Sequence, residues 1–310
     1  MSLIKKPHEL QITETVRALI YGQPGIGKTT LGLSAPSPLI IDTDRGIHRT
    51  AAEHLKDTVP VSCWQDIIDL LKEDLSEYKT LVIDTAGKAI DFLTIHICKE
   101  QPRLMQTDGT LSLKGYGVRK QAFSNFITHV TSLGKNIIFI AHEREEKDGD
   151  NRYIRPEIGG SSGNDLMKDL DLVGYVESFN NKRTISFNAT DKFYGKNTAK
   201  LPPRIEIPDY TGNSEPVFMQ EILNLYVEFI MDKQKLSLEY NALLDVIEEN
   251  IDGVVDMETA NEVAEKLKTM QHIWDSKLRA AYKLNTKAAE LNLRWNKALN
   301  TYEPINSSKK

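Results

Sequence analysis

One glycine-rich segment constrains the fold of this chain more than any other feature. Directly after the apolar run Val16–Tyr21 come Gly22, Gln23, Pro24, Gly25, Ile26, Gly27, Lys28, Thr29 and Thr30. This is the G-x-x-x-x-G-K-[ST] pattern in its strand–loop–helix setting. Glycines let consecutive backbone N–H groups line one concave surface, and the start of the following helix adds positive potential. The pattern predicts a site for the phosphates of a nucleoside triphosphate, the alternative being a chance glycine-rich turn.

A second motif fits the same site. Thr80-Leu-Val-Ile-Asp84 is an apolar run that ends in a carboxylate. We expect Lys28 to contact the β- and γ-phosphates, Thr29 to ligate Mg²⁺ and Asp84 to hold the metal through water. A carboxylate at the end of a strand is weak evidence alone, and its pairing with the glycine-rich segment strengthens it. ATP and Mg²⁺ are therefore the expected cofactors, with Thr29 and Asp84 as the metal residues.

The rest of the N-terminal two thirds alternates short apolar runs with helix-length segments. The expected strands are Val16–Tyr21, Leu39–Thr43, Val59–Cys63, Thr80–Thr85, Asn136–His142, Val173–Ser178 and Thr184–Thr190. The expected helices between them include Trp64–Tyr78, Ala89–Glu100 and Val118–Leu133. Apolar strands without polar alternation are typical of strands covered on both faces, so the pattern predicts an α/β fold with a mostly parallel sheet.

The pattern changes after the turn-rich stretch Pro208–Pro216. Helices are expected near 217–234, 238–250, 259–270 and 272–301, with Thr259 and Glu262 as a capping box for the third. No strand is expected there. We therefore predict an α/β domain over residues 1–213 and an all-helical domain over residues 214–310.

Composition excludes several classes of protein. Apolar residues make up 40% and charged residues 27% of the chain, which argues against disorder. Its two cysteines, Cys63 and Cys98, cannot build a disulfide framework, and no apolar run has the length of a membrane helix. The N-terminus lacks the apolar core of a signal peptide, so we expect a cytoplasmic protein with no membrane partner. The net charge of −5 argues against coating of duplex DNA by charge alone, so any nucleic-acid site must be local.

The order of these segments resembles the RecA-like recombinase ATPases. In that family the strand after the phosphate-loop helix ends in I-D-x-E, and here it reads Ile41-Asp42-Thr43-Asp44. The resemblance implies that Asp44 activates the attacking water, with a side chain one methylene shorter than glutamate. It also implies that His142, at the end of Asn136–His142, senses the γ-phosphate. Alternatively, Asp44 is a solvated residue and His142 only closes a strand.

Later segments extend the resemblance. Leu111–Lys120 is similar to the first DNA loop of these ATPases, and Gly159–Leu166 is similar to the end of the second. Lys196, in Phe193-Tyr-Gly-Lys196-Asn197, resembles a lysine that enters the ATP site of the neighbouring subunit, which would make the active protein a homo-oligomer, ring or filament. The alternative is an exposed hairpin lysine. The A-H-E strand end and the G-K-N segment look most like the phage-encoded single-strand-annealing proteins of the Sak group, which would place the protein in the host cytoplasm.

Basic residues interleaved with aromatic ones suit single-stranded nucleic acid. Two such places lie in the expected core, and the residues that we expect to contact DNA are Lys114, Tyr116, Arg119, Lys120, Arg144, Arg152 and Arg155. A third basic stretch, 277–297, is expected to pair with the acidic stretch 248–265 instead.

These observations predict a RecA-like ATPase that acts on single-stranded DNA in phage recombination, by annealing or strand exchange. Single-stranded DNA, further copies of the chain and a single-strand-binding or replication protein are the expected partners. The main alternative is a nucleotide-gated ATPase that binds a protein and not DNA. A small-molecule kinase is a third reading, which the absence of an arginine-rich lid argues against.

Overall fold

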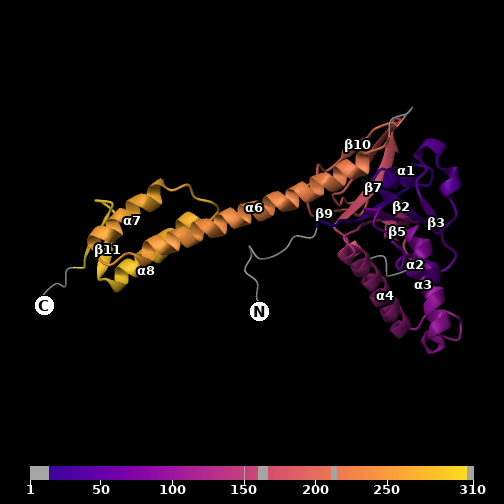
Figure 1. Cartoon of the computed structure of the whole chain (residues 1–310), viewed down its shortest axis with the longest axis horizontal. Coiled ribbons are helices and arrows are strands. Elements are labelled where there is room, and N and C mark those ends of the chain that lie inside the picture. The colour runs from indigo at the N-terminus through magenta and orange to yellow at the C-terminus, as the bar shows by residue number, and fades with distance from the viewer. Residues whose placement is uncertain (1–13, 150, 160–166, 211–214, 306–310) are drawn as a thin grey trace. The chain divides into compact units, whose positions relative to one another are not determined.

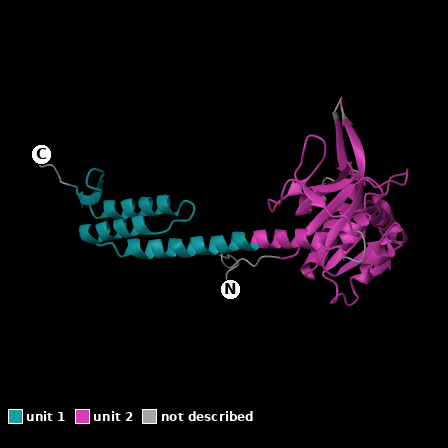
Figure 2. Cartoon of the chain, turned by 90° about the horizontal axis from the view of Figure 1, so that it is seen from above, with its two compact units in different colours: residues 1–12, 231–310 teal, residues 13–230 magenta. Residues whose placement is uncertain are grey.

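The computed structural model describes residues 14–149, 151–159, 167–210 and 215–305. Two compact units divide the chain (Figure 2). The sheet unit ends at Ile230, and the helical unit begins at Met231. The division falls inside a helix at 230/231, whereas the sequence placed a domain boundary at 213/214.

The sheet unit is built on one large, mostly parallel sheet (Figure 1). Its strands follow the order β10-β8-β7-β1-β5-β4-β2-β3, with β6 paired to β5 and β9 paired to β7. Strands β8 and β10 are antiparallel to their neighbours. The bounds are β1 Arg17–Gly22, β2 Pro38–Asp42, β3 Thr58–Pro60, β4 Thr80–Asp84, β5 Asn136–Asp148, β6 Asn151–Pro156, β7 Leu172–Phe179, β8 Lys182–Ser186, β9 Lys196–Asn197 and β10 Ile205–Ile207. The expected α/β class with a mostly parallel sheet is confirmed.

Helices of the sheet unit connect these strands. They are α1 Lys28–Leu33, α2 Trp64–Leu70, α3 Ala86–Glu100 and α4 Leu113–Ser132, with short 3₁₀ turns at Ile47–Arg49, Ala52–His54 and Pro102–Leu104. Alternate residues of the central strands enter different cores, because side chains alternate across a sheet. Leu19 and Phe139 pack in the core with α2, α3 and α4, whereas Ile20 and Ile140 pack in the core with α1.

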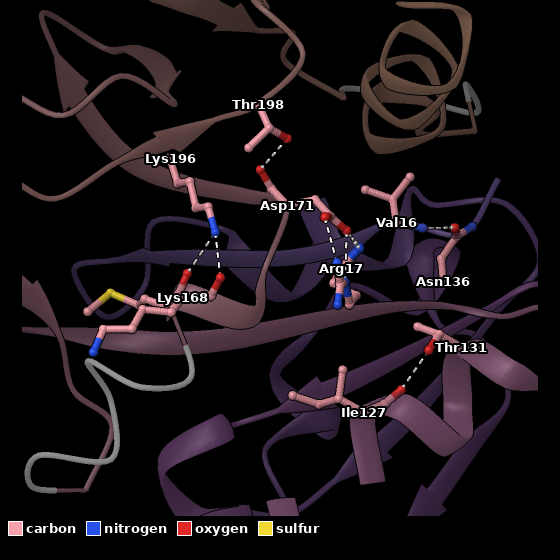
Figure 3. A network of polar contacts seen from close by, with 10 residues as sticks. Val16, Arg17, Ile127, Thr131, Asn136, Lys168, Asp171, Lys196 and Thr198 are labelled. Carbon is pink, nitrogen blue, oxygen red and sulfur yellow. Dashed lines mark hydrogen bonds and ion pairs between the residues drawn. The ribbon is translucent and has the colours of Figure 1, made fainter. Parts of the chain in front are cut away.

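The start of β1 is fixed by a charged pair. Arg17 donates from Nε and Nη2 to the two carboxylate oxygens of Asp171, at 3.0 and 2.9 Å, and its backbone N–H also donates to Asp171 at 2.9 Å (Figure 3). Such two-pronged charged hydrogen bonds are stronger than neutral ones. Asp171 thereby holds the strand that leads into the glycine-rich segment.

We expect Asp171→Ala to lower the free energy of unfolding of the sheet unit by about 2 kcal/mol, because it removes charged hydrogen bonds and leaves the Arg17 N–H without its partner. Urea unfolding, with amide exchange in β1 as a local readout, measures this. The control is Asp191→Ala on an exposed loop, which should change stability by less than about 0.5 kcal/mol. Equal effects of the two substitutions would contradict the assignment.

The C-terminal region differs from expectation in two ways. One continuous helix, α6 Phe218–Asp252, replaces the two expected over 217–234 and 238–250, because the residues between them include no glycine or proline. The region is also not all-helical: α8 Ser276–Glu290 is followed by a hairpin of β11 Leu293–Asn296 and β12 Thr301–Pro304. Asn292 and Asn300 turn the chain with positive φ angles of 56° and 54°.

The third helix of the region, α7 Met257–Thr269, begins two residues earlier than expected. Asp256 is its N-cap and exchanges hydrogen bonds with Thr259, so the expected pairing of Thr259 with Glu262 was wrong. Lys283 pairs with Glu248 at 2.5 Å, which is one instance of the expected pairing between the basic and acidic stretches. Among the described residues, no helix is both long enough and apolar enough to cross a lipid bilayer.

Candidate nucleotide site

The glycine-rich segment joins β1 to α1 as a tight loop. Gly25 and Gly27 have φ angles of 78° and 89°, a region in which residues with a Cβ are strained. A Cβ on Gly22 would lie 2.4 Å from the carbonyl oxygen of Val176 in β7. The loop thus requires glycine at these positions for backbone conformation and for close approach of two strands.

Lys28 lies at the start of α1 and is only 6% exposed. Its Nζ donates to the carbonyl oxygens of Gly22 and Gln23, at 2.9 and 2.7 Å. Burial lowers its pKa, while the negative charges of Asp84 and Glu143 act in the opposite direction. A buried ammonium inside a loop of glycines is suited to bind a polyanion, because phosphate oxygens would offset the cost of its desolvation.

Thr29 and Asp84 meet beside this lysine. The Thr29 hydroxyl donates to Asp84 Oδ2 at 2.7 Å. The pKa of Asp84 is raised to about 6, chiefly by burial and also by the nearby charges of Asp44 and Asp42, while the hydrogen bond from Thr29 acts in the opposite direction. The described residues include no cluster of three or more His, Cys, Asp or Glu that could hold a metal. A hydroxyl and one carboxylate suit Mg²⁺, which usually keeps waters and takes further oxygens from substrate phosphates.

The two aspartates after β2 hold a turn. Asp42 is buried and accepts hydrogen bonds from the backbone N–H groups of Gly46 and Ile47, at 3.0 and 3.3 Å. Asp44 is exposed, and its Oδ1 accepts from the N–H of Gly46 at 2.9 Å. Asp42 registers opposite Asp84 across the sheet, so Asp44 lies at the same edge as the metal residues. The role of Asp44 in activating the attacking water stays a prediction.

His142 registers opposite Gly22, so it lies next to the glycine-rich loop. By alternation along β5 it shares the face of Ile138 and Ile140, which pack on the α1 side. Burial and the charge of Lys28 lower its pKa, which keeps the imidazole neutral at pH 7. Its buried Nδ1 has no hydrogen-bond partner within the described part of the chain.

Glu143 is a site residue that the sequence did not single out. It follows His142 on the opposite face of β5, and its Oε2 is buried without a partner in the described structure. Its charge raises the pKa of Lys28, and it accepts a hydrogen bond from Tyr175, whose pKa rises mainly through burial. The sequence shows that a carboxylate, Glu143, follows His142. It does not show that this side chain contacts Tyr175 of β7.

Arg183 was also missed. A Cβ on Gly27 would lie 2.6 Å from its Nη1, so the guanidinium of β8 lies directly against the loop. It donates to the carbonyl oxygen of Pro208 at 3.0 Å. Arg183, Ile26, Thr30 and Tyr210 line a small hollow beside the loop. Nothing in the local sequence indicates this approach, which depends on the antiparallel strand β8, far along the chain.

Comparison with known proteins agrees with this geometry. A family profile described as an AAA domain (AAA_24) matches residues 14–199, more than half of the chain. The chain belongs to this family. The AAA domain thus coincides with the sheet that carries the phosphate loop, and it identifies a P-loop ATPase core.

Two further comparisons are less informative. Among solved structures, the flagellar accessory protein FlaH from Methanocaldococcus jannaschii matches with 13% identity and a TM-score of 0.36, covering 62% of this chain and 84% of that protein. The comparison with curated proteins finds no match.

Lys196 lies within the AAA domain, on β9. Its Nζ donates to the carbonyl oxygens of Lys168 and Met167, at 2.7 and 3.4 Å (Figure 3). In this chain Lys196 therefore binds backbone carbonyl groups of the segment that precedes β7. Its action in a neighbouring subunit stays a prediction.

The first group of expected DNA residues lies on a helix and not on a loop. Lys114, Tyr116, Arg119 and Lys120 belong to α4, which begins at Leu113 and not near Val118. Lys114, Tyr116 and Lys120 are exposed, but Arg119 is only 6% exposed. Its guanidinium donates to the Thr94 hydroxyl at 2.9 Å and to the Gly159 carbonyl at 3.3 Å, so it supports the interior of the AAA domain instead of facing solvent.

The second group lies on a β-hairpin where the sequence predicted a loop. Strand β5 continues past His142 to Asp148 and pairs with β6. Arg144 pairs with Glu146, Arg152 lies 3.7 Å from Glu145, and Arg155 lies 3.9 Å from Glu146. Arg155 also lies over the rings of Tyr153 and Tyr194, at 5.3 and 5.8 Å. The expected second DNA loop falls mostly on residues 160–166, which lie outside the described residues.

Proposed function

We propose that this AAA-domain protein hydrolyses ATP with Mg²⁺ and acts on single-stranded DNA as a homo-oligomer, by annealing or strand exchange in phage recombination. The observation that carries the enzymatic part is the meeting of Lys28, Thr29 and Asp84 at the glycine-rich loop, with Thr29 and Asp84 joined at 2.7 Å. The resemblance of the chain to Sak-group proteins supports the recombination part.

The residues of the site divide the chemistry among them. Lys28 and the loop N–H groups bind the phosphates, while Thr29 and Asp84 position Mg²⁺, which neutralises charge on the phosphate oxygens when bound. Asp44 orients water at the same sheet edge. The neutral His142 can donate or accept a hydrogen bond near the γ-phosphate.

Strand β5 offers a physical link between ATP and DNA. It carries His142 beside the loop and, one residue further on, enters the hairpin that bears Arg144, Arg152 and Arg155. A shift of His142 on loss of the γ-phosphate would move this hairpin, because both belong to one strand.

Retention of oligo-dT at low salt, with and without ATP, tests the DNA role. We expect Arg152→Ala to weaken retention and to reduce the dependence of log affinity on log salt by about 1, as for loss of one phosphate contact. The matched control is Arg204→Ala, which removes another surface arginine paired to a carboxylate, Glu177 at 2.8 Å. Failure of the unaltered protein to retain oligo-dT in any nucleotide state would exclude DNA as its ligand.

A specific observation favours the second candidate, a nucleotide-gated ATPase that binds a protein. Each hairpin arginine has a glutamate of the same hairpin near it, which reduces the charge available to DNA. ATP-dependent binding of a protein by this hairpin, without retention of oligo-dT, would select this candidate.

A further inference from the structure

The helical unit contains a groove that the ATPase function does not use. It lies between α7, α8 and the β11–β12 hairpin and has a volume of about 260 Å³. Ala264, Leu267, Ala280 and Leu284 form its buried floor, and Trp295 and Tyr302 form a wall. The groove is open because alanine occupies positions where the two helices and the hairpin could hold larger side chains.

The wall of the groove is held in place. The rings of Trp295 and Tyr302 meet edge to face, with centroids 4.9 Å apart. The Tyr302 hydroxyl donates to Asn285 Oδ1 at 2.7 Å, which fixes the ring against α8. An apolar cavity of roughly 150 Å³ accommodates benzene, so a groove of this size has room for one large aliphatic or aromatic side chain.

The rim of the groove is positive. Lys268 and Lys277 belong to the lining, and the described residues of the lining include no carboxylate. The Nζ of Lys268 lies 5.3 Å from the centre of the Trp295 ring, while its ammonium also pairs with Glu265. An apolar floor with lysines at its edge complements a ligand that combines an apolar group with negative charge.

The surface next to the groove is unusually apolar for an exposed helix. Leu278 and Tyr282 of α8 are 75% and 74% exposed. Each precedes a groove residue by three positions, Ala281 and Asn285 respectively, so each lies beside the groove on the same helix surface. Exposed apolar side chains that extend a hollow are typical of an interaction site.

We propose that this groove binds an acidic peptide segment of a partner protein, with one large aliphatic or aromatic residue of the peptide as its anchor. The anchor fills the space above Ala264 and Ala280. Acidic residues beside it pair with Lys277 and Lys268, and the peptide backbone crosses Leu278 and Tyr282. Charge complementarity argues for this occupant over the segment Ser307–Lys310 of the same chain, whose sequence has lysines and no carboxylate side chain.

Selection of a random-peptide display library on the full chain tests the proposal. We expect enriched peptides to contain an apolar residue flanked by Asp or Glu. The affinity of the most enriched peptide, made with a fluorescent label and followed by anisotropy, is expected to fall at least about tenfold in Lys277→Glu. Ala281→Trp, which places a large ring at the mouth of the groove, is expected to abolish binding.

The matched control is Lys99→Glu, the same charge reversal at an exposed residue of α3 in the sheet unit, which should leave peptide affinity unchanged. Unaltered ATP hydrolysis and circular dichroism show that a variant is folded. If Ala281→Trp does not fold, Lys277→Glu alone still decides the test. Enrichment of peptides without carboxylates, or affinity that neither groove variant changes, would overturn the proposal. Self-association of the chain that Ala281→Trp abolishes, followed by analytical ultracentrifugation, would also overturn it, because a second copy would then be the occupant.

Discussion

Replacing Lys28 by alanine is expected to lower kcat for ATP hydrolysis by roughly 10²–10³-fold, the cost typical of removing one charge-stabilising group from a transition state. The side chain is buried, and its Nζ lies within 3 Å of two loop carbonyls, where phosphate oxygens would bind. Alanine is compatible with the start of α1, and the substitution removes a charge whose burial is unfavourable. Steady-state hydrolysis by purified protein, with and without oligo-dT, measures the effect.

The control is Lys88→Ala, which removes an exposed lysine of α3 in the same unit. Its hydrolysis rate should equal that of the unaltered chain. Stimulation of hydrolysis by oligo-dT that disappears in Lys28→Ala would tie the phosphate site to DNA. Full hydrolysis by Lys28→Ala would show that the glycine-rich loop is not the site of ATP turnover.

Asp84→Asn is expected to abolish Mg²⁺-dependent hydrolysis and at the same time to stabilise the nucleotide-free protein. The pKa of Asp84 is about 6 in the folded chain, against an ordinary value of 3.8, chiefly because the carboxyl is buried. Each unit of pKa difference corresponds to about 1.4 kcal/mol, so the ionised carboxylate costs on the order of 3 kcal/mol of stability at pH 7.5. Asparagine has no such charge and can still accept the Thr29 hydrogen bond.

The sign of the pH dependence follows from the direction of this shift. A carboxyl with a raised pKa binds its proton more tightly in the folded state, so its cost is absent below about pH 4 and is complete above about pH 6. The stability gain of Asp84→Asn should therefore be present at pH 7.5 and disappear near pH 4. Urea unfolding at both pH values, without nucleotide or metal, measures it, with Asp191→Asn as the exposed control. A loss of stability at pH 7.5 would contradict the assignment.

The sequence predicted those parts of the site that lie close together along the chain. The phosphate loop is one such segment, since its strand, glycines and helix are contiguous. The mostly parallel sheet was also predictable, because the buried strands are apolar throughout and helical segments separate them. The place of Asp84 beside Thr29 was expected from the pairing of an apolar run that ends in a carboxylate with the glycine-rich segment.

Features that depend on distant strands could not be predicted. Arg183 reaches Gly27 from the antiparallel strand β8, and no spacing in the sequence indicates that contact. Arg119 has the same charge as its exposed neighbours, and only the tertiary packing of α4 shows that it is buried. The β11–β12 hairpin was read as helix because the spacing of Trp295 from Leu291 also fits a helical stripe, while Asn292 ends the helix through a left-handed turn.

The pairing of β5 with β6 limits how the hairpin can change in length. In a paired strand, one inserted residue reverses the face of every side chain that follows it. A single insertion between His142 and Arg144 would therefore exchange the two faces of the hairpin while leaving the phosphate loop intact. Insertions beyond Glu146, near the hairpin turn, would preserve the phosphate loop and also the faces of the side chains from His142 to Glu146. The hairpin turn is thus the place to graft a foreign epitope or a fluorescent label without disturbing the histidine beside the loop.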